Sequence, residues 1–303
     1  MKIDKGIFPV LQAPFTRDGT DIDLEDLSRE TDAVISDGAN GMVLFGYSTE
    51  FMHLSVPECD RMLRVVVDTC AGRIPVIPSV TRTTPAEAVD DAAKYADAGA
   101  DAVMILPLFR EDFVKTIQAV ARRVGEKLPI MVQYAPQNNG IELPFGDFAK
   151  IRESIPNHFS VKAEPQPAGP YIEEFIRETQ GRIPIYTGWA GVTMYEALER
   201  GAAGIMPSAS FVAVYVKFYR EFSEGSKEKA FELYTKVLPY IYMYMGRFGA
   251  RDKQLFVRRG IFKTDIYRPY PPENKNPIDP YNDAAMWKYF EQLKALFPKE
   301  IPW

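Results

Sequence analysis

The segment Asp97–Leu106, DAGADAVMIL, decides the fold, because it joins the end of one helix to the start of a buried strand. Gly99 stands where a helix is closed by a residue in the left-handed conformation, and Ala102–Leu106 is a short apolar run next to turn residues. The same joint occurs in DGANGMVLFG (37–46) and in ERGAAGIMPS (199–208). This repeated helix–turn–strand joint predicts a chain in which strands and helices alternate.

Eight apolar runs of this kind are separated by amphipathic helical patterns. They are Ile7–Leu11, Met42–Phe45, Pro75–Ser79, Ala102–Leu106, Ile130–Tyr134, Phe159–Lys162, Ile183–Thr187 and Gly204–Pro207. Runs this apolar are typical of strands covered on both faces, as in a parallel sheet. Eight such strands predict an α/β protein with a (β/α)8 TIM barrel, and an open doubly wound sheet is the structural alternative. No G-x-G-x-x-G follows a strand, which argues against a dinucleotide-binding fold.

The pattern changes to helices alone after the eighth strand. Helices are predicted at Phe211–Glu224, Lys227–Arg247, Asp252–Lys263 and Ala284–Phe297. The last two are separated by YRPYPPENKNPIDP (267–280), which is too rich in proline for a helix or a strand. We predict a barrel over residues 1–224 and a C-terminal helical extension over 225–303, packed on the barrel as one structural unit. A small separate domain is the alternative.

The composition limits the class of protein. The chain has 303 residues, and its net charge of -5 argues against binding to nucleic acid or to an anionic membrane surface. No apolar run approaches the ~20 residues of a membrane span. Cys59 and Cys70 lie on one predicted helix about 16 Å apart, too far for a disulfide, which fits a reducing cytoplasm. His53 and His158 have no cysteine or histidine cluster beside them, so no metal site is expected.

Lys162 is the first candidate for chemistry. In a TIM barrel the active site lies at the C-terminal ends of the strands, and Lys162 ends the sixth apolar run. Desolvation at the mouth of an apolar barrel disfavours the ammonium form. A neutral lysine can attack a carbonyl and form a Schiff base. A structural salt bridge with Glu164 is the alternative.

Two further groups belong to the same end of the predicted barrel. Tyr134 ends the preceding run, IMVQY, so we expect it to lie beside Lys162 across the ladder and to move protons. A buried tyrosine with a satisfied hydroxyl is the alternative. The loop Gly46–Glu50, GYSTE, offers backbone N–H and hydroxyl donors that can hold a carboxylate.

These motifs together resemble the dihydrodipicolinate synthase / N-acetylneuraminate lyase superfamily of class I, pyruvate-dependent aldolases. The resemblance covers nearly the whole chain, from GIFPVLQAPFTRDGTDID through GYSTEFMHLSVPE, PVIPSVT, YADAGADAVMILP, IMVQYAP, SVKAE and YTGWAG to RGAAGIMPS. Its most specific feature is a tyrosine on strand five followed about 28 residues later by a lysine that ends strand six. Tyr134 and Lys162 occupy those two positions in this sequence.

The resemblance implies a lyase that forms a Lys162 imine with pyruvate or a related 2-oxo acid, with Tyr134 as the second catalytic residue. Such an imine is an electron sink, so no metal or organic cofactor is expected, and the enamine can add to an aldehyde or be released by retro-aldol cleavage. A dehydratase or hydratase-aldolase on a 2-oxo sugar acid or an aromatic analogue remains open. So does a non-catalytic barrel that binds a 2-oxo acid. The family also implies a homotetramer or a homodimer.

The resemblance also implies the substrate-binding residues. Ser48 and Thr49 match the loop that holds the carboxylate of the 2-oxo acid. Gly188 and Met206 match positions that line the site through their backbones.

The sequence departs from the family at several of these positions. Tyr47 stands where the family has a small hydroxyl residue, and Phe109 stands where it has a tyrosine. After its catalytic tyrosine the synthase motif reads N-x-P-x-R-T-G, whereas Tyr134 is followed by A-P-Q-N-N-G, apparently one residue shorter and without the arginine. Losing that arginine disfavours a doubly acidic substrate. Asn138 suits a neutral hydroxyl-bearing partner such as a sugar-derived aldehyde, and Tyr47 allows an aromatic or bulkier one.

Overall fold

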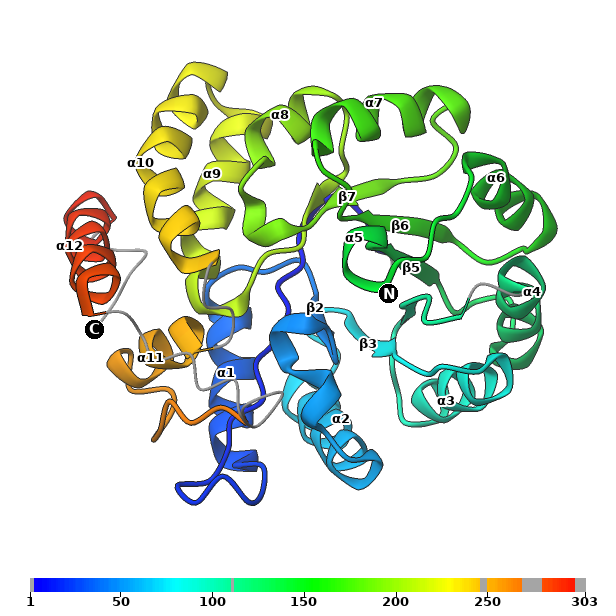
Figure 1. Cartoon of the computed structure of the whole chain (residues 1–303), viewed down its shortest axis with the longest axis horizontal. Helices are drawn as coiled ribbons and strands as arrows, with labels where there is room; N and C mark the ends of the chain where they lie inside the picture. Colours follow the sequence, from blue (N-terminus) through cyan, green and yellow to red (C-terminus); the bar gives the residue numbers. More distant parts are fainter. Residues whose placement is uncertain (1–2, 110–111, 246–249, 269–279, 298–303) are drawn as a thin grey trace.

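Eight parallel strands form the centre of the computed structural model, which describes residues 3–109, 112–245, 250–268 and 280–297 (Figure 1). The strands are β1 (Gly6–Ile7), β2 (Met42–Leu44), β3 (Val76–Val80), β4 (Val103–Ile105), β5 (Ile130–Tyr134), β6 (Phe159–Ala163), β7 (Ile185–Thr187) and β8 (Gly204–Ile205). Their order in the sheet is β1-β8-β7-β6-β5-β4-β3-β2. Val10, just after β1, bridges both Val43 and Ser208 in parallel, which closes the sheet into a ring. The predicted TIM barrel is therefore confirmed, and the open sheet is not observed.

Helices follow the strands and surround them (Figure 1). The outer helices are α1 (Leu24–Ser36), α2 (Val56–Cys70), α3 (Pro85–Asp97), α4 (Phe113–Val124), α6 (Phe145–Ser154), α7 (Ala168–Glu178), α8 (Met194–Glu199) and α9 (Val212–Glu224). Short turns at the ends of the strands are η1 (Tyr47–Thr49), η2 (Phe51–His53), α5 (Pro136–Asn139), η3 (Trp189–Gly191) and η4 (Ala209–Phe211). Local sequence sets the helix starts: α2 begins with a capping box between Ser55 and Glu58, and α3 begins with Pro85 after the capping residue Thr84.

Successive side chains along each strand point to opposite sides of the barrel wall and pack in two separate layers. Side chains inside the barrel form one cluster, which includes Val43, Met104 and Met131. The intervening residues face the helices and belong to the larger cluster, as Ile130 and Val132 of β5 do. This alternation decides which side chains of β5 and β6 can reach the barrel mouth.

The helices after the barrel lie on one side of it. They are α10 (Lys227–Met245), α11 (Ala250–Arg258) and α12 (Pro280–Leu296). α10 packs on α9 and α12, and α11 packs on η4 (Figure 1). The segment after α11 is tied to α1 and α2 by ion pairs. Arg259 pairs with Asp37, Lys263 pairs with Asp23, and Arg268 pairs with Glu58. Most of the predicted proline-rich crossing, residues 269–279, lies outside the described residues.

Three expectations from the composition can be compared with the residues that the structure describes. Cys59 and Cys70 both lie on α2 as free thiols, and burial raises the pKa of the Cys59 thiol to about 12. Within the described ranges, no helix combines the length and the apolar character that a membrane crossing requires. The same residues contain no group of three or more histidine, cysteine or acidic side chains arranged to hold a metal ion.

Candidate active site

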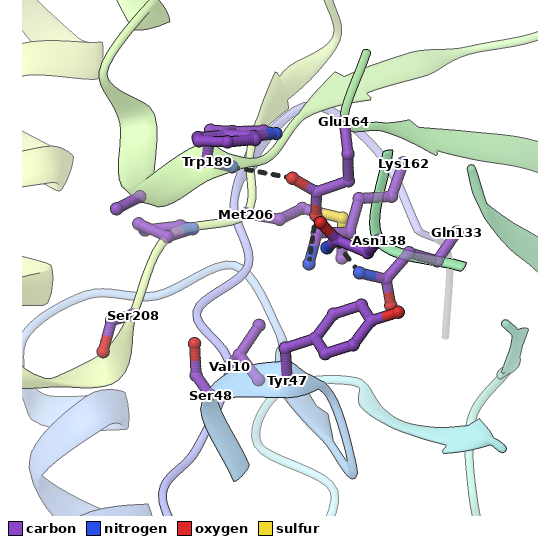
Figure 2. A pocket seen from close by; sticks show the side chains of 12 residues that line it. Val10, Tyr47, Ser48, Gln133, Asn138, Lys162, Glu164, Trp189, Met206 and Ser208 are labelled. Atoms are coloured by element: carbon purple, nitrogen blue, oxygen red, sulfur yellow. Dashed lines mark hydrogen bonds and ion pairs between the residues drawn. The ribbon is translucent and has the colours of Figure 1, made fainter. Parts of the chain in front are cut away.

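A pocket opens at the carboxyl ends of the strands, where a TIM barrel places its chemistry (Figure 2). It is lined by Val10, Tyr47, Ser48, Gln133, Asn138, Lys162, Glu164, Trp189, Ala190, Met206, Pro207 and Ser208. The structure thus brings together six of the residues named in the sequence analysis, namely Lys162, Glu164, Tyr47, Ser48, Asn138 and Met206.

Lys162 and Glu164 are alternate residues at the end of β6, so both side chains point into the barrel. They are 5% and 6% exposed, and Lys162 Nζ lies 3.1 Å from Glu164 Oε1. Gln133 Nε2 donates to the same carboxylate oxygen at 3.1 Å, and the backbone N–H of Trp189 donates to Oε2 at 2.9 Å. Figure 2 shows the Glu164 carboxylate between these three donors. Lys162 and Glu164 are therefore both largely buried and form the ion pair that the sequence analysis gave as the alternative for Lys162. In this arrangement the carboxylate lies close enough to accept a proton from the lysine nitrogen.

The expectation that Tyr134 lies beside Lys162 is wrong. In the ladder between β5 and β6, Lys162 pairs with Gln133, and Tyr134 pairs with Ala163. Paired residues of neighbouring strands face the same side of the sheet, so Gln133 enters the pocket and Tyr134 faces the outer helices.

Tyr134 packs outside the barrel wall. Its ring stacks on Tyr171 at 5.6 Å and meets the edge of Phe148 at 5.5 Å, and its hydroxyl accepts a hydrogen bond from the Leu143 N–H at 3.3 Å. Burial raises the pKa of this phenol. Tyr134 therefore matches the alternative given in the sequence analysis, a buried tyrosine whose hydroxyl is hydrogen-bonded, and not a residue that moves protons in the pocket.

The sequence did contain a signal for Gln133. The synthase motif has its proline three residues after the tyrosine, whereas Pro136 comes two residues after Tyr134 and three after Gln133. The segment that looked one residue shorter therefore aligns without a gap when Gln133 takes the tyrosine's position. Glu164 had a signal too, because a spacing of two along a strand puts it on the same face as Lys162.

Tyr47 and Ser48 form the wall contributed by η1. Burial raises the pKa of the Tyr47 phenol, the negative charge of Glu164 raises it further, and a hydrogen bond with the Asn138 side chain partly offsets both. In Figure 2, Ser48 and Ser208 lie on the side of the pocket away from Gln133. A ligand in the pocket would thus meet hydroxyl groups at one end and the Lys162–Glu164 pair at the other.

Thr49 and Gly188 do not line the pocket. Thr49 is fully buried, where its hydroxyl donates to the Leu11 carbonyl at 2.7 Å and accepts from the Gly46 N–H at 3.2 Å, so it shapes η1 from behind. Gly188 lies against Glu164: a Cβ at this position would be 2.4 Å from each carboxylate oxygen. Its missing side chain leaves the space that the carboxylate occupies.

Trp189 carries no signal that we detected in the sequence. It and Ala190 both adopt left-handed backbone conformations, with φ of 51° and 50°. Such conformations are unfavourable for residues with a Cβ and occur most often where the surroundings enforce them. Here the turn aims the Trp189 N–H at Glu164.

Comparison with known proteins gives a consistent result. The model of the Dihydrodipicolinate synthetase family matches residues 4–275. The chain is 28% identical to the 4-hydroxy-tetrahydrodipicolinate synthase of Methanopyrus kandleri over 78% of this chain and 79% of the relative. It is 27% identical to the L-2-keto-3-deoxyarabonate dehydratase of Azospirillum brasilense over 84% of each chain.

Solved structures agree with the fold. A Pseudomonas aeruginosa protein assigned as a dihydrodipicolinate synthetase superimposes with a TM-score of 0.86 at 25% identity, covering 96% of this chain and 100% of that one. YagE of Escherichia coli K12, solved in complex with pyruvate, gives a TM-score of 0.84 at 21% identity over 97% and 99% of the two chains, a likeness of fold alone.

Proposed function

Because the chain belongs to the dihydrodipicolinate synthetase family, we propose that it is a lyase that forms an imine between Lys162 and a 2-oxo acid. The observation that carries this proposal is the position of Lys162, buried at the carboxyl end of β6 with its Nζ 3.1 Å from a carboxylate that can take its proton. A protonated imine withdraws electrons from the adjacent carbon, so the chemistry calls for no cofactor.

We assign the 2-oxo acid's carboxylate to the η1 side of the pocket. The Ser48 hydroxyl lines this side and can donate a hydrogen bond to a carboxylate oxygen. The 2-oxo carbon would then face Lys162, and the rest of the substrate would extend toward Tyr47, Asn138 and Trp189.

The charges of the pocket favour a substrate with one carboxylate. In the part of the chain that the structure describes, Lys162 is the one cationic side chain in the lining, and Glu164 adds a negative charge beside it. Tyr47 and Asn138 offer a hydroxyl and an amide instead of a second cation. We therefore propose pyruvate with a neutral aldehyde, or the corresponding longer 2-oxo acid, as the substrates.

Dehydration of a 2-oxo sugar acid is the second candidate. It uses the same imine but breaks a carbon–oxygen bond. Two observations favour it: a carboxylate lies within reach of the imine nitrogen, and one relative is named a 2-keto-3-deoxy sugar acid dehydratase. Water loss and carbon–carbon cleavage give different products, which chromatography of the reaction mixture distinguishes.

Borohydride trapping tests the imine. The protein is incubated with pyruvate and sodium borohydride, and the modified peptide is mapped by mass spectrometry. We expect one reduced adduct on Lys162 and none in Lys162→Ala. An unmodified Lys162 after incubation with a panel of 2-oxo acids would leave a non-catalytic binding barrel as the better description.

A further inference from the structure

We propose that Glu164, rather than a tyrosine, is the catalytic residue that moves protons between Lys162 and the substrate. The proposal rests on the proposed imine chemistry and deepens it. Among the described residues that line the pocket, the titratable side chains are Tyr47, Lys162 and Glu164. Of these, Glu164 is the partner of the nucleophile, at 3.1 Å from its nitrogen.

The surroundings fix the carboxylate in this place. Gln133 holds one oxygen and the Trp189 N–H holds the other, so the group has a single orientation relative to Lys162. Both donors are neutral, so Lys162 supplies the one positive charge next to it among the pocket's described lining residues. Gln133 has no acidic proton to give, so it can orient Glu164 but cannot replace it.

The protons of imine formation balance through this one carboxylate. Lys162 starts as an ammonium group and gives one proton to Glu164, which leaves the neutral amine. The nitrogen lone pair attacks the 2-oxo carbon, the carbonyl electrons move to oxygen, and Glu164 protonates that oxygen. Glu164 then takes a second proton from nitrogen and delivers it to the hydroxyl, which leaves as water. Two of the three ammonium protons have moved to the departing oxygen, one remains on the iminium nitrogen, and Glu164 is again a carboxylate.

The same group can act at the next carbon. The Glu164 carboxylate takes a proton from C3, the C–H electron pair becomes the C2–C3 double bond, and the iminium electrons return to nitrogen to give an enamine. With an aldehyde, the enamine carbon forms the new bond and Glu164 protonates the aldehyde oxygen. With a hydroxyl on C4, the enamine electrons expel that hydroxyl, and Glu164 returns its proton to form water. We expect one carboxyl to serve both reactions.

Exchange of the C3 protons of pyruvate in D2O, followed by proton NMR, reports this step without knowledge of the second substrate. We compare the full-length wild type with Glu164→Gln, Tyr47→Phe and the surface control Glu174→Gln, whose residue pairs with Arg177 on α7. General acid–base groups contribute roughly 10²- to 10⁴-fold. We expect Glu164→Gln to lose that much exchange while Lys162 is still trapped by borohydride after long incubation. Tyr47→Phe should lose less exchange than Glu164→Gln, and the surface control Glu174→Gln should stay within about threefold of the wild type.

A second variant separates chemistry from folding. Glu164→Ala leaves room for a small carboxylate, so added formate should restore exchange in this variant, and chloride should not. The role of Glu164 would be overturned if Glu164→Gln exchanged the C3 protons at the wild-type rate. It would also be overturned if Tyr47→Phe lost more exchange than Glu164→Gln. Absence of rescue in a folded Glu164→Ala variant that still forms the adduct would count against it as well. A wild type that forms no adduct at all would instead remove the proposed function itself.

Discussion

Replacing Gly188 by alanine tests whether the exact position of the Glu164 carboxylate matters. The added Cβ would lie 2.4 Å from both carboxylate oxygens and 2.5 Å from Cδ. Non-bonded carbon and oxygen atoms repel strongly at such distances, so the carboxylate must retreat by roughly 1 Å. It cannot do so and keep both hydrogen bonds, from Trp189 at 2.9 Å and from Gln133 at 3.1 Å.

The expected loss follows from this displacement. A misplacement of about 1 Å at a reacting group costs on the order of a hundredfold in rate, which corresponds to about 2.7 kcal/mol. Crowding a packed interior costs about 1–3 kcal/mol of folding stability. We therefore expect Gly188→Ala to exchange pyruvate protons about a hundredfold more slowly and to melt at a lower temperature. Lys162 should still form the adduct, because the nucleophile itself is unchanged in this variant.

Gly146→Ala is the matched control. Gly146 lies in the first turn of α6, and an added Cβ there meets nothing within 4 Å. Alanine in a helix is favoured over glycine by up to about 1 kcal/mol, so this variant should be equally active and at least as stable. If Gly188→Ala kept the wild-type exchange rate, the carboxylate's position would not control proton transfer, and the reasoning would fail.

Three further predictions concern other parts of the molecule. Tyr134→Phe should change the exchange rate less than about threefold, because its hydroxyl faces Leu143 and not the pocket; a hundredfold loss would contradict the observed ladder register. Lys253→Met should destabilise the fold by about 3–5 kcal/mol in urea titrations, because it leaves Glu50 buried without its ion-pair partner; the double variant Lys253→Met/Glu50→Gln should recover part of that loss. Burial raises the pKa of the Glu30 carboxyl well above its ordinary value, so the folded state holds a proton that the unfolded state releases. Stability should therefore fall as pH rises from the carboxyl's ordinary pKa toward the raised one, and Glu30→Gln should reduce the difference in melting temperature between about pH 5 and about pH 8; an unchanged difference would refute the assignment.

The barrel could be predicted because its signals are local. Gly38, Gly99 and Gly201 all adopt positive φ at the ends of helices, as the repeated joints indicated. The apolar runs that follow them became strands β2, β4 and β8. Boundaries differ by a few residues, because ladder pairing rather than hydrophobicity ends a strand: Ile183–Thr187 became Ile185–Thr187.

The facing of β5 could not be predicted in the same way. In a strand covered on both faces, every residue is buried, so hydrophobicity does not distinguish the barrel side from the helix side. Which of Gln133 and Tyr134 faces inward depends on the register with β6, and a shift of one residue exchanges them. The family's spacing between tyrosine and lysine matched this sequence by coincidence, because Tyr134 directly follows Gln133, the residue that faces into the barrel. Trp189 was missed for a different reason: its contribution is a backbone N–H, which any residue type could supply.

If Glu164 moves the protons, it must also select substrates by charge. A carboxylate held about 4 Å from a second negative group in a partly screened pocket repels it by on the order of 4 kcal/mol. Lys162 offsets this for the carboxylate of the 2-oxo acid itself, because its positive charge persists in the protonated imine. A second acidic group on the substrate would meet Glu164 without any further cation among the described lining residues, and would face the neutral Tyr47 and Asn138. The residue that replaces the tyrosine's chemistry thereby also disfavours a doubly acidic substrate, so proton transfer and specificity should change together when Glu164 is neutralised.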